Sequence, residues 1–196
     1  YIHPDAAAIE RQWHIGRNSS GPFATRYNVA PTSMVPILRR VDDIDGWELA
    51  MARWSFVPHW WKQAKPPAMT INARSEEAQT NPLTGEVKTF KQPFLLRRED
   101  FEPFCFAGLL SRWHANETAE PLLTVAILTR QASASTCAVH ERMPVVLPDA
   151  SLGAWLDADT RSAASATKQI EQAQSDFLHY PVRTLVNNAR NEGPEL

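Results

Sequence analysis

Polar residues able to do chemistry occur in four short segments, each next to an apolar stretch. These are residues 26–31 (RYNVAP), 54–61 (WSFVPHWW), 71–74 (INAR) and 139–144 (VHERMP). Arginine beside exposed aromatic rings suits single-stranded nucleic acid, because a guanidinium binds phosphate and a ring stacks on a base. Alone, Arg74 also fits a surface ion pair, Trp60-Trp61 fits a core, and His140 fits a structural histidine. The combination favours a nucleic-acid site.

The order of these segments along the chain carries a resemblance. RYNVAP is followed by W-x-F-x-P-x-WW, INAR, a strand ending in Trp113, HERMPVVL, and the closing residues 186–196 (VNNARNEGPEL). This order resembles the SOS response-associated peptidase (SRAP) family over nearly the whole chain. The resemblance implies a cysteine autopeptidase with lyase-like chemistry, which links covalently to the ring-opened aldehyde of an abasic site in single-stranded DNA.

The resemblance also implies a nucleophile and its helpers. The family nucleophile is a cysteine that becomes N-terminal when self-processing removes the initiator methionine. Its α-amine, with a pKa near ~8, can form a Schiff base, and its thiol can close on the imine carbon to give a stable ring. Asn72 matches the asparagine that orients the amine or the sugar oxygen, and His140 matches the histidine assigned to proton transfer. The DNA-binding positions expected here are Arg26, Asn28, Pro31, Trp60, Trp61, Arg74 and Arg142.

The nucleophile itself is expected upstream of Tyr1. The family's Met-Cys-Gly-Arg start does not occur in these 196 residues, and Tyr1 matches the residue that follows it. Cys105 and Cys137 cannot replace the missing cysteine, because neither has a free α-amine. Both are expected to be buried, reduced thiols.

A second departure concerns a carboxylate. Family members carry a glutamate in a G-L-W-E-x-W segment, whereas residues 108–113 read GLLSRW, so Ser111 stands where the glutamate is expected. A hydroxyl donates hydrogen bonds but is not a base near neutral pH without an activating group. Two further hypotheses therefore stay open: a noncatalytic module that binds single-stranded DNA or abasic sites, and a housekeeping fold whose tryptophans are simply core.

Composition narrows the class of protein. The chain has 43% hydrophobic residues, and Lys+Arg 20 against Asp+Glu 22 gives a net charge of −2, which argues against coating nucleic acid by bulk charge but permits a local basic groove. No cysteine or histidine spacing resembles a metal site, and no cofactor is expected. No apolar run approaches the ~20 residues of a membrane span. We expect a cytoplasmic protein, bacterial or phage-type, that associates with the nucleoid through DNA.

The elements that must position these residues can be read from hydrophobic periodicity. One domain is expected over residues 1–196, with the native N-terminus extending further upstream. A helix is predicted over residues 6–13, capped by Asp5, and a hairpin pairs strands 34–40 and 47–56 around the turn 42–46. The remaining predictions are strands at 69–73, 101–110, 122–129, 145–147 and 180–186, helices at 150–156 and 163–173, a helix opening at 75–77, and a loop at 81–91. This pattern predicts an α+β fold around a curved, mainly antiparallel, barrel-like sheet with flanking helices.

Overall fold

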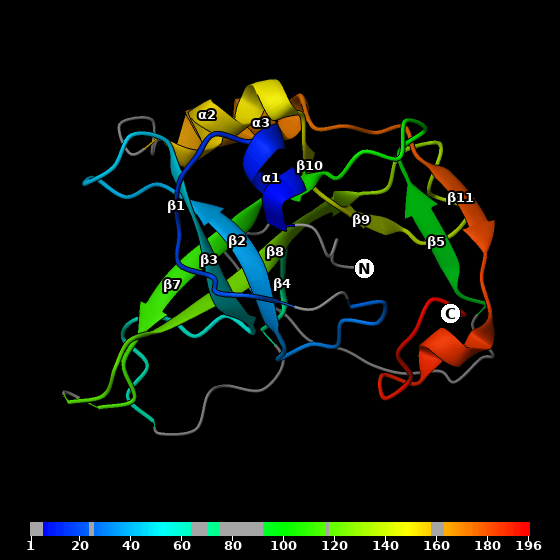
Figure 1. Cartoon of the computed structure of the whole chain (residues 1–196). Coiled ribbons are helices and arrows are strands. Elements are labelled where there is room, and N and C mark those ends of the chain that lie inside the picture. The colour runs from blue at the N-terminus through cyan, green and yellow to red at the C-terminus, as the bar shows by residue number, and fades with distance from the viewer. Residues whose placement is uncertain (1–5, 24–25, 64–69, 75–91, 117, 158–162) are drawn as a thin grey trace.

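The computed structural model describes residues 6–23, 26–63, 70–74, 92–116, 118–157 and 163–196 (Figure 1). The helices are α1 (Ala6–Gln12), α2 (Asp149–Leu156), α3 (Ala163–Glu171) and the 3-10 helix η1 (Thr184–Asn187). The strands are β1 (Ile15–Asn18), β2 (Met34–Arg39), β3 (Trp47–Trp54), β4 (Asn72–Arg74), β5 (Phe94–Arg97), β6 (Cys105–Phe106), β7 (Gly108–Trp113), β8 (Leu122–Gln131), β9 (Arg142–Pro144), β10 (Val146–Leu147) and β11 (Leu178–Pro181).

A hairpin of β2 and β3 forms one side of the large sheet. Met34 to Arg39 pair antiparallel with Arg53 to Glu48, as the alternating pattern predicts. Gly46 ends the turn at a φ of 89°, and a Cβ atom there would lie 2.5 Å from the His14 ring. Glycine is therefore required both by the backbone conformation and by the close approach of His14.

Strand β8 is the centre of the large sheet. One edge pairs antiparallel with β7 over residues 122–127 and then with β9 over 129–131. The other edge pairs parallel with β3 at residues 124–125 and then with β4 at 127–129. Because each edge changes partner midway, β8 carries residues from four chain segments to one place.

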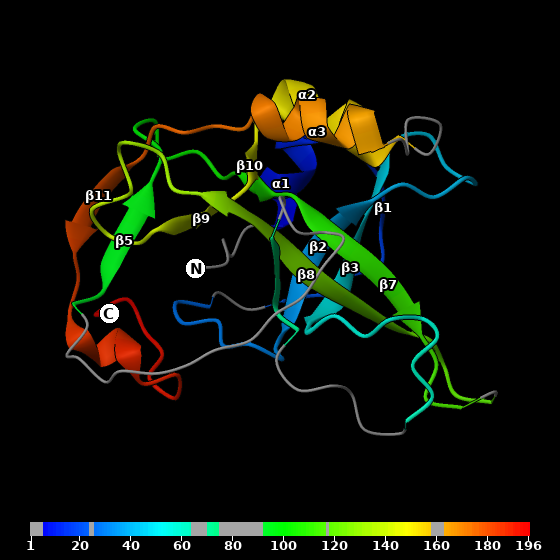
Figure 2. The same ribbon diagram turned by 180° about the vertical axis from the view of Figure 1, so that it is seen from behind.

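The helices pack on one face of this sheet and bury the main core. Ile9 of α1, Trp13 directly after α1 and Leu152 of α2 lie against Leu49 of β3 and Leu128 of β8. The Trp13 indole also donates a hydrogen bond of 3.0 Å to the Asp149 carboxylate at the start of α2. Figures 1 and 2 show α1, α2 and α3 gathered at the same end of the sheet.

Two small antiparallel sheets complete the fold. β5 pairs with β11, and β6 pairs with β10. Leu96 on the inner face of the β5–β11 sheet packs on a second cluster formed by Met143, Val146 and Phe177. The β5–β11 sheet lies at the opposite side of the molecule from β1 and β7 (Figures 1 and 2).

The α+β class with a curved sheet and flanking helices is confirmed. The large sheet is mixed, since β1, β4 and β8 make parallel pairs, and the pairings of the described strands do not close into a barrel. The expected strand at 101–110 is divided, because Phe101 adopts a φ of 63° and the extended chain begins only at Cys105. The expected strand at 180–186 ends at Pro181, and residues 184–187 form η1 instead. The cap at Asp5, the helix opening at 75–77 and the loop at 81–91 lie outside the described residues.

Candidate DNA-binding and reaction site

Four residues meet on one face of the large sheet, near the end of β8. Asn72 and Arg74 of β4 pair with Ile127 and Thr129, and Arg142 of β9 pairs with Gln131. Residues two apart on a strand share a face, so Asn72, Thr129 and Arg142 lie on the face opposite the helices, and Arg74 joins them by its backbone pairing with Thr129. We call these four residues the β8 cluster; the Arg74 side chain is outside what the structure describes. Asn72 and Arg142, 70 positions apart in the sequence, thus lie on one sheet face, along opposite edges of β8.

Thr129 anchors the guanidinium of Arg142. The Nη2 atom donates to the Thr129 carbonyl at 2.7 Å and to its Oγ1 at 3.1 Å, and Nε donates to the same Oγ1 at 3.2 Å. Thr129 is buried, and Asn72, which pairs two residues earlier on β8, is exposed. A fixed cation and an exposed amide on the same face can bind phosphate or sugar oxygens of a strand laid across it.

His140 lies two residues before Arg142, in the segment that leads into β9. Its Nδ1 atom is 2.9 Å from the Arg142 backbone nitrogen and 3.0 Å from the Arg142 carbonyl oxygen. The N–H can donate to the neutral ring, which places the ring proton on Nε2, and the carbonyl can accept from the protonated ring. The backbone N–H and carbonyl of Arg142 therefore give the His140 ring a hydrogen-bond partner whether the ring is neutral or protonated. This arrangement suits proton transfer.

Arg26 and Asn28 are held elsewhere, by the C-terminal segment. The Asn28 Nδ2 atom donates to the carbonyls of Val186 and Asn188, each at 3.0 Å. The Glu192 carboxylate accepts the backbone N–H groups of Tyr27 and Asn28 and forms an ion pair with Arg26 at 3.3 Å. We call Arg26, Asn28 and Glu192 the C-terminal clamp. The polar groups of RYN that the sequence predicts for DNA are thus engaged in holding two chain segments together.

The tryptophan pair lies at the far end of β8. Trp113, opposite Leu122, donates its indole N–H to the Trp61 carbonyl at 2.8 Å. Leu122 is five residues from Ile127, which is about 17 Å along a strand. The Trp60 side chain is 62% exposed and tilted against Trp61, with ring centroids 6.3 Å apart. Because Leu122 and Ile127 are an odd number of residues apart, Trp113 faces away from the β8 cluster, so the exposed Trp60 ring can stack on a base only where a strand passes this end of the sheet.

Pro31 belongs to a turn that Trp54 fixes between these two ends. The Thr32 N–H donates to the Trp54 carbonyl at 2.8 Å, and the Trp54 N–H donates to the Ser33 carbonyl at 2.9 Å. The Trp54 indole donates to the Ile71 carbonyl at 2.9 Å, directly before Asn72. Pro31 is exposed on this turn, so an apolar contact with DNA there is compatible with the fold.

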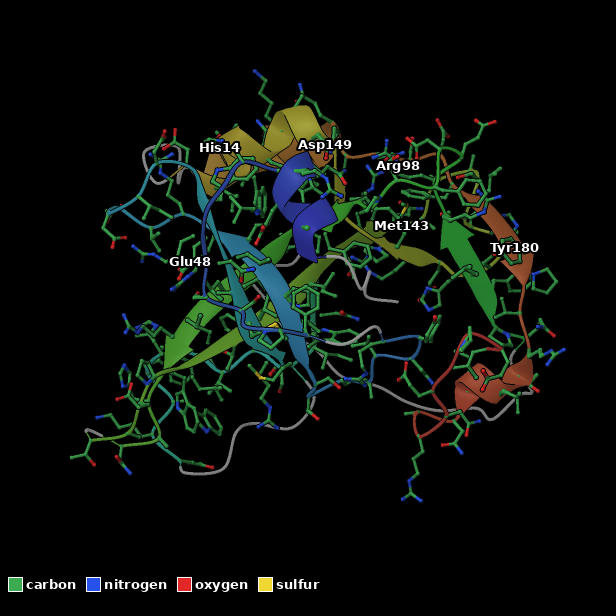
Figure 3. The ribbon with its side chains drawn as sticks, in the orientation of Figure 1. His14, Glu48, Arg98, Met143, Asp149 and Tyr180 are labelled. Carbon is green, nitrogen blue, oxygen red and sulfur yellow. The ribbon has the colours of Figure 1, made fainter. Side chains whose placement is uncertain are left out.

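Ser111 is not brought to the β8 cluster. It pairs with Thr124, three residues from the partner of Asn72, and an odd separation places it on the opposite face of the sheet. The side chain is 7% exposed, and its Oγ atom has no hydrogen-bond partner among the residues that the structure describes. The buried Glu48 does not lie in the cluster either, because Arg39 and Ser19 each hold one of its carboxylate oxygens at 2.6 Å (Figure 3).

The two cysteines differ from the expected pair of buried thiols. Burial raises the pKa of the Cys105 thiol to about 12, which makes it a poor nucleophile. Cys137 is exposed, in correction of the prediction, because it lies in the turn-rich stretch before β9 rather than in a strand. Among the described residues, no group of three or more His, Cys, Asp or Glu side chains could hold a metal ion. The described helices include none with the length and apolarity to cross a membrane.

Three residues that support the site were not identified from the sequence. Thr129 fixes Arg142, Trp54 fixes the Pro31 turn, and Glu192 closes the clamp. Trp54 belongs to the segment 54–61, so this motif was the signal from which its role could have been found. Thr129 and Glu192 carried no local signal, because their contacts depend on residues 13 and 166 positions away.

The sequence matches the family described as SOS response associated peptidase (SRAP), in two segments covering residues 1–88 and 84–189. The abasic site processing protein YedK of Escherichia coli (strain K12) is 32% identical over 87% of this chain and 83% of its own length. YoqW of Bacillus subtilis (strain 168), of the same description, is 28% identical over 90% of this chain and 87% of its own. HMCES of Gallus gallus is 29% identical over 89% of this chain and 66% of its own.

The alignments also show a difference in length. The alignment with YoqW runs over 197 positions but takes in 90% of the 196 residues here, so about 20 of its positions have no counterpart in this chain. The two family segments meet at residues 84–88, between β4 and β5 and outside the described residues.

Solved structures agree on the fold. A protein from Bordetella bronchiseptica superimposes with a TM-score of 0.70 at 22% identity, over 93% of this chain and 97% of its own. A protein from Bacteroides thetaiotaomicron gives a TM-score of 0.65 at 21% identity, over 84% and 80%. With the family profile matched over most of its length, the chain belongs to the SOS response associated peptidase family.

Proposed function

We propose that this protein binds single-stranded DNA and captures abasic sites as a covalent DNA–protein crosslink, through an N-terminal cysteine upstream of Tyr1. The observation that carries the proposal is the β8 cluster, where Asn72 and Arg142 share one sheet face and His140, just before β9, lies against the Arg142 backbone. Membership of a family whose relatives are named abasic site processing proteins supports the same substrate.

In this proposal the cysteine α-amine attacks the aldehyde carbon of the ring-opened abasic sugar. Loss of water gives an imine, and the thiol then adds to the imine carbon to close a ring. The amide of Asn72 orients the amine or the sugar oxygen. His140 delivers the proton that the departing hydroxyl needs, from its Nε2 atom, while Nδ1 stays on the Arg142 peptide. The same thiol removes the initiator methionine by attack on the carbonyl of the preceding peptide bond, which frees the cysteine α-amine and leaves methionine as a thioester that water then hydrolyses.

The DNA strand crosses the β8 cluster and passes the end of the large sheet where the tryptophan pair lies. Arg74 and Arg142 neutralise phosphates next to the abasic site, and the exposed Trp60 ring stacks on a base beyond that end. Arg26 and Asn28 support DNA binding by holding chain segments in place and not by contacting the DNA, since both belong to the C-terminal clamp. A protein of this kind acts where DNA damage exposes single-stranded DNA.

A second function is a noncatalytic module for single-stranded DNA or abasic sites. Ser111 favours it, because this side chain offers no carboxylate and lies buried on the opposite face from Asn72. Such a module keeps the β8 cluster for binding but lacks the acid–base group, which typically contributes about 10²–10⁴-fold to a reaction rate.

One experiment separates the two. The full-length protein, with its upstream residues, is incubated with single-stranded DNA that holds one abasic site, and the products are run on native and denaturing gels. Covalent capture predicts a slow band that survives denaturation and is lost when the upstream cysteine is changed to alanine. A shift on the native gel alone would identify the noncatalytic module, and no shift on either gel would contradict both.

A further inference from the structure

Strand β7 lies at an edge of the large sheet and presents both of its faces to solvent. Among the described residues it pairs with β8 alone (Figure 1). Leu109 is 39% exposed, and the next residue, Leu110, is 42% exposed. Neighbouring residues of a strand point to opposite faces, so these two leucines mark the two sides of the sheet at the same place.

One of these two sides is the side of the β8 cluster. Asn72 and Gly108 pair with the same residue of β8, Ile127, from its two edges. Residues that lie in one row across a sheet point to the same face, and so does every second residue along a strand. Leu110 and Arg112 are two and four residues after Gly108, so both lie on the face that carries Asn72. The intervening residues of β7 point to the other face.

The residues of β7 on this face form a surface that continues the β8 cluster. We call Gly108, Leu110 and Arg112 the β7 track. Beside it, Val125 of β8 lies between Leu110 and Trp54 of β3, which makes the floor apolar. A Cβ atom at Gly108 would lie 3.0 Å from the Val125 Cγ2 atom. The glycine therefore leaves the row of Asn72 open, and a ligand can approach the backbone closely there.

Arg112 ends the track with an exposed positive charge, and it forms no ion pair with another described residue. Glu48 is the only acidic residue in the described strands of the large sheet, and Arg39 neutralises it at 2.6 Å. The exposed Glu120 lies in the turn between β7 and β8, outside the strands. The track therefore carries a net positive charge, which selects a polyanion as its ligand. Its continuity with the β8 cluster identifies that polyanion as the same DNA strand.

We propose that single-stranded DNA runs from Asn72 along the β7 track and that Arg112 binds one of its phosphates. This inference rests on the proposed function, because it places the abasic site at Asn72. The β8 partners of Asn72 and Arg112, Ile127 and Leu123, are four residues apart, which is about 13 Å along the strand. At a stacked spacing of about 3.4 Å, this distance holds no more than about four nucleotides. Arg142 lies beyond Asn72 in the opposite direction, so the abasic sugar sits between two phosphate-binding arginines.

The salt dependence of DNA binding by the full-length protein tests the contact at Arg112. The probe is a single-stranded oligonucleotide with one reduced abasic site, which has no aldehyde and therefore reports binding without crosslinking. Arg112→Ala should weaken binding about tenfold at low salt, because a charge-assisted contact is lost. It should also reduce the slope of log K against log salt by about 0.7. Arg40→Ala, which removes an exposed arginine just after β2, should leave both quantities unchanged.

The two leucines of β7 provide a matched test of which face the DNA follows. Leu110→Glu places a carboxylate on the track and should weaken binding about tenfold or more, because it repels the phosphates. Leu109→Glu makes the same change at nearly the same exposure on the other face. It should leave affinity within about twofold, since salt screens a charge that the strand does not approach. Melting temperatures show that both variants are folded.

Trimmed oligonucleotides locate the contact along the DNA. The flank on one side of the reduced abasic site is shortened to a single nucleotide, first on the 5′ side and then on the 3′ side. The loss of affinity caused by Arg112→Ala should disappear when the flank on the β7 track is removed, and it should persist when the other flank is removed. A loss that survives both trims would contradict the path along β7.

The results also separate this inference from the proposed function. If the unaltered protein binds the oligonucleotide and both Arg112→Ala and Leu110→Glu bind it equally well, the track is wrong and the proposed function stands. Equal losses in Leu109→Glu and Leu110→Glu would likewise overturn the assignment of the DNA to one face. If the unaltered protein does not bind, the proposed function is wrong and the track fails with it.

Discussion

The β8 cluster and the C-terminal clamp are held together in different ways. In the cluster, backbone pairing along β8 sets where Asn72 and Arg142 lie, and the Arg142 guanidinium adds hydrogen bonds to Thr129. In the clamp, the 26–28 segment and the C-terminal segment meet through side chains, and Asn28 and Glu192 spend their hydrogen bonds on that contact. Matching a functional motif does not show which of its polar residues remain available for a ligand.

The largest effect is expected at His140, on the cluster side. His140→Ala should slow crosslink formation by roughly 10²–10⁴-fold, because the proton donor beside the Arg142 peptide is lost. Affinity for single-stranded DNA should stay within about twofold of the unaltered protein, since the ring carries no phosphate contact in the proposal. Single-turnover rates and native binding curves measure the two quantities separately. An equal loss of rate and affinity would assign His140 to binding.

A matched pair of asparagines sets the two regions against each other. Asn28→Ala should lower the free energy of unfolding by about 1–3 kcal/mol, because two carbonyls lose their donor. Asn72→Ala, at an exposed position, should change it by no more than about 0.5 kcal/mol and abolish most of the crosslinking. Chemical denaturation and the denaturing gel give both readouts. The comparison fails if Asn28→Ala leaves stability unchanged and removes DNA binding.

The clamp should also give the protein a specific acid sensitivity. The Tyr27 N–H, followed by Asn28 and Arg26, holds the pKa of Glu192 below its usual range. A carboxyl with a lowered folded pKa stabilises the protein above its unfolded pKa of about 4.3, and this contribution is lost as pH falls through the folded pKa. The Glu192→Gln variant should therefore have a lower melting temperature than the unaltered protein at neutral pH. This difference in melting temperature should disappear below about pH 4. A difference that persists in acid would show that the carboxylate charge is not the cause.

The smallest effect is expected at Ser111. Because its buried hydroxyl has no partner in the described part of the chain, Ser111→Ala should leave the free energy of unfolding within about 0.5 kcal/mol or raise it slightly. Crosslinking should be unchanged, since the side chain lies on the face opposite Asn72. A drop in the crosslinking rate without a loss of stability would return Ser111 to the reaction site.

Local patterns predicted the parts of the fold that are built from neighbouring residues. The β2–β3 hairpin follows from alternation around a glycine turn, and its strands lie within two residues of the predicted ends. The four-residue strands β1 and β5 were missed, because so short a strand shows little alternation. The parallel partners of β8 and the contact of Glu192 with Arg26 depend on residues brought together only in the folded chain, so neither has a local signature.

The most direct test compares two arginines, one from each region, through the salt dependence of binding to single-stranded DNA. Arg74→Ala should weaken binding to all sequences and reduce the slope of log K against log salt by about 0.7, the value for one phosphate contact on a single strand. Arg26→Ala should leave that slope unchanged, because Arg26 is paired with Glu192. A reduced slope for Arg26→Ala with no change for Arg74→Ala would place the DNA on the clamp and contradict the site on β8.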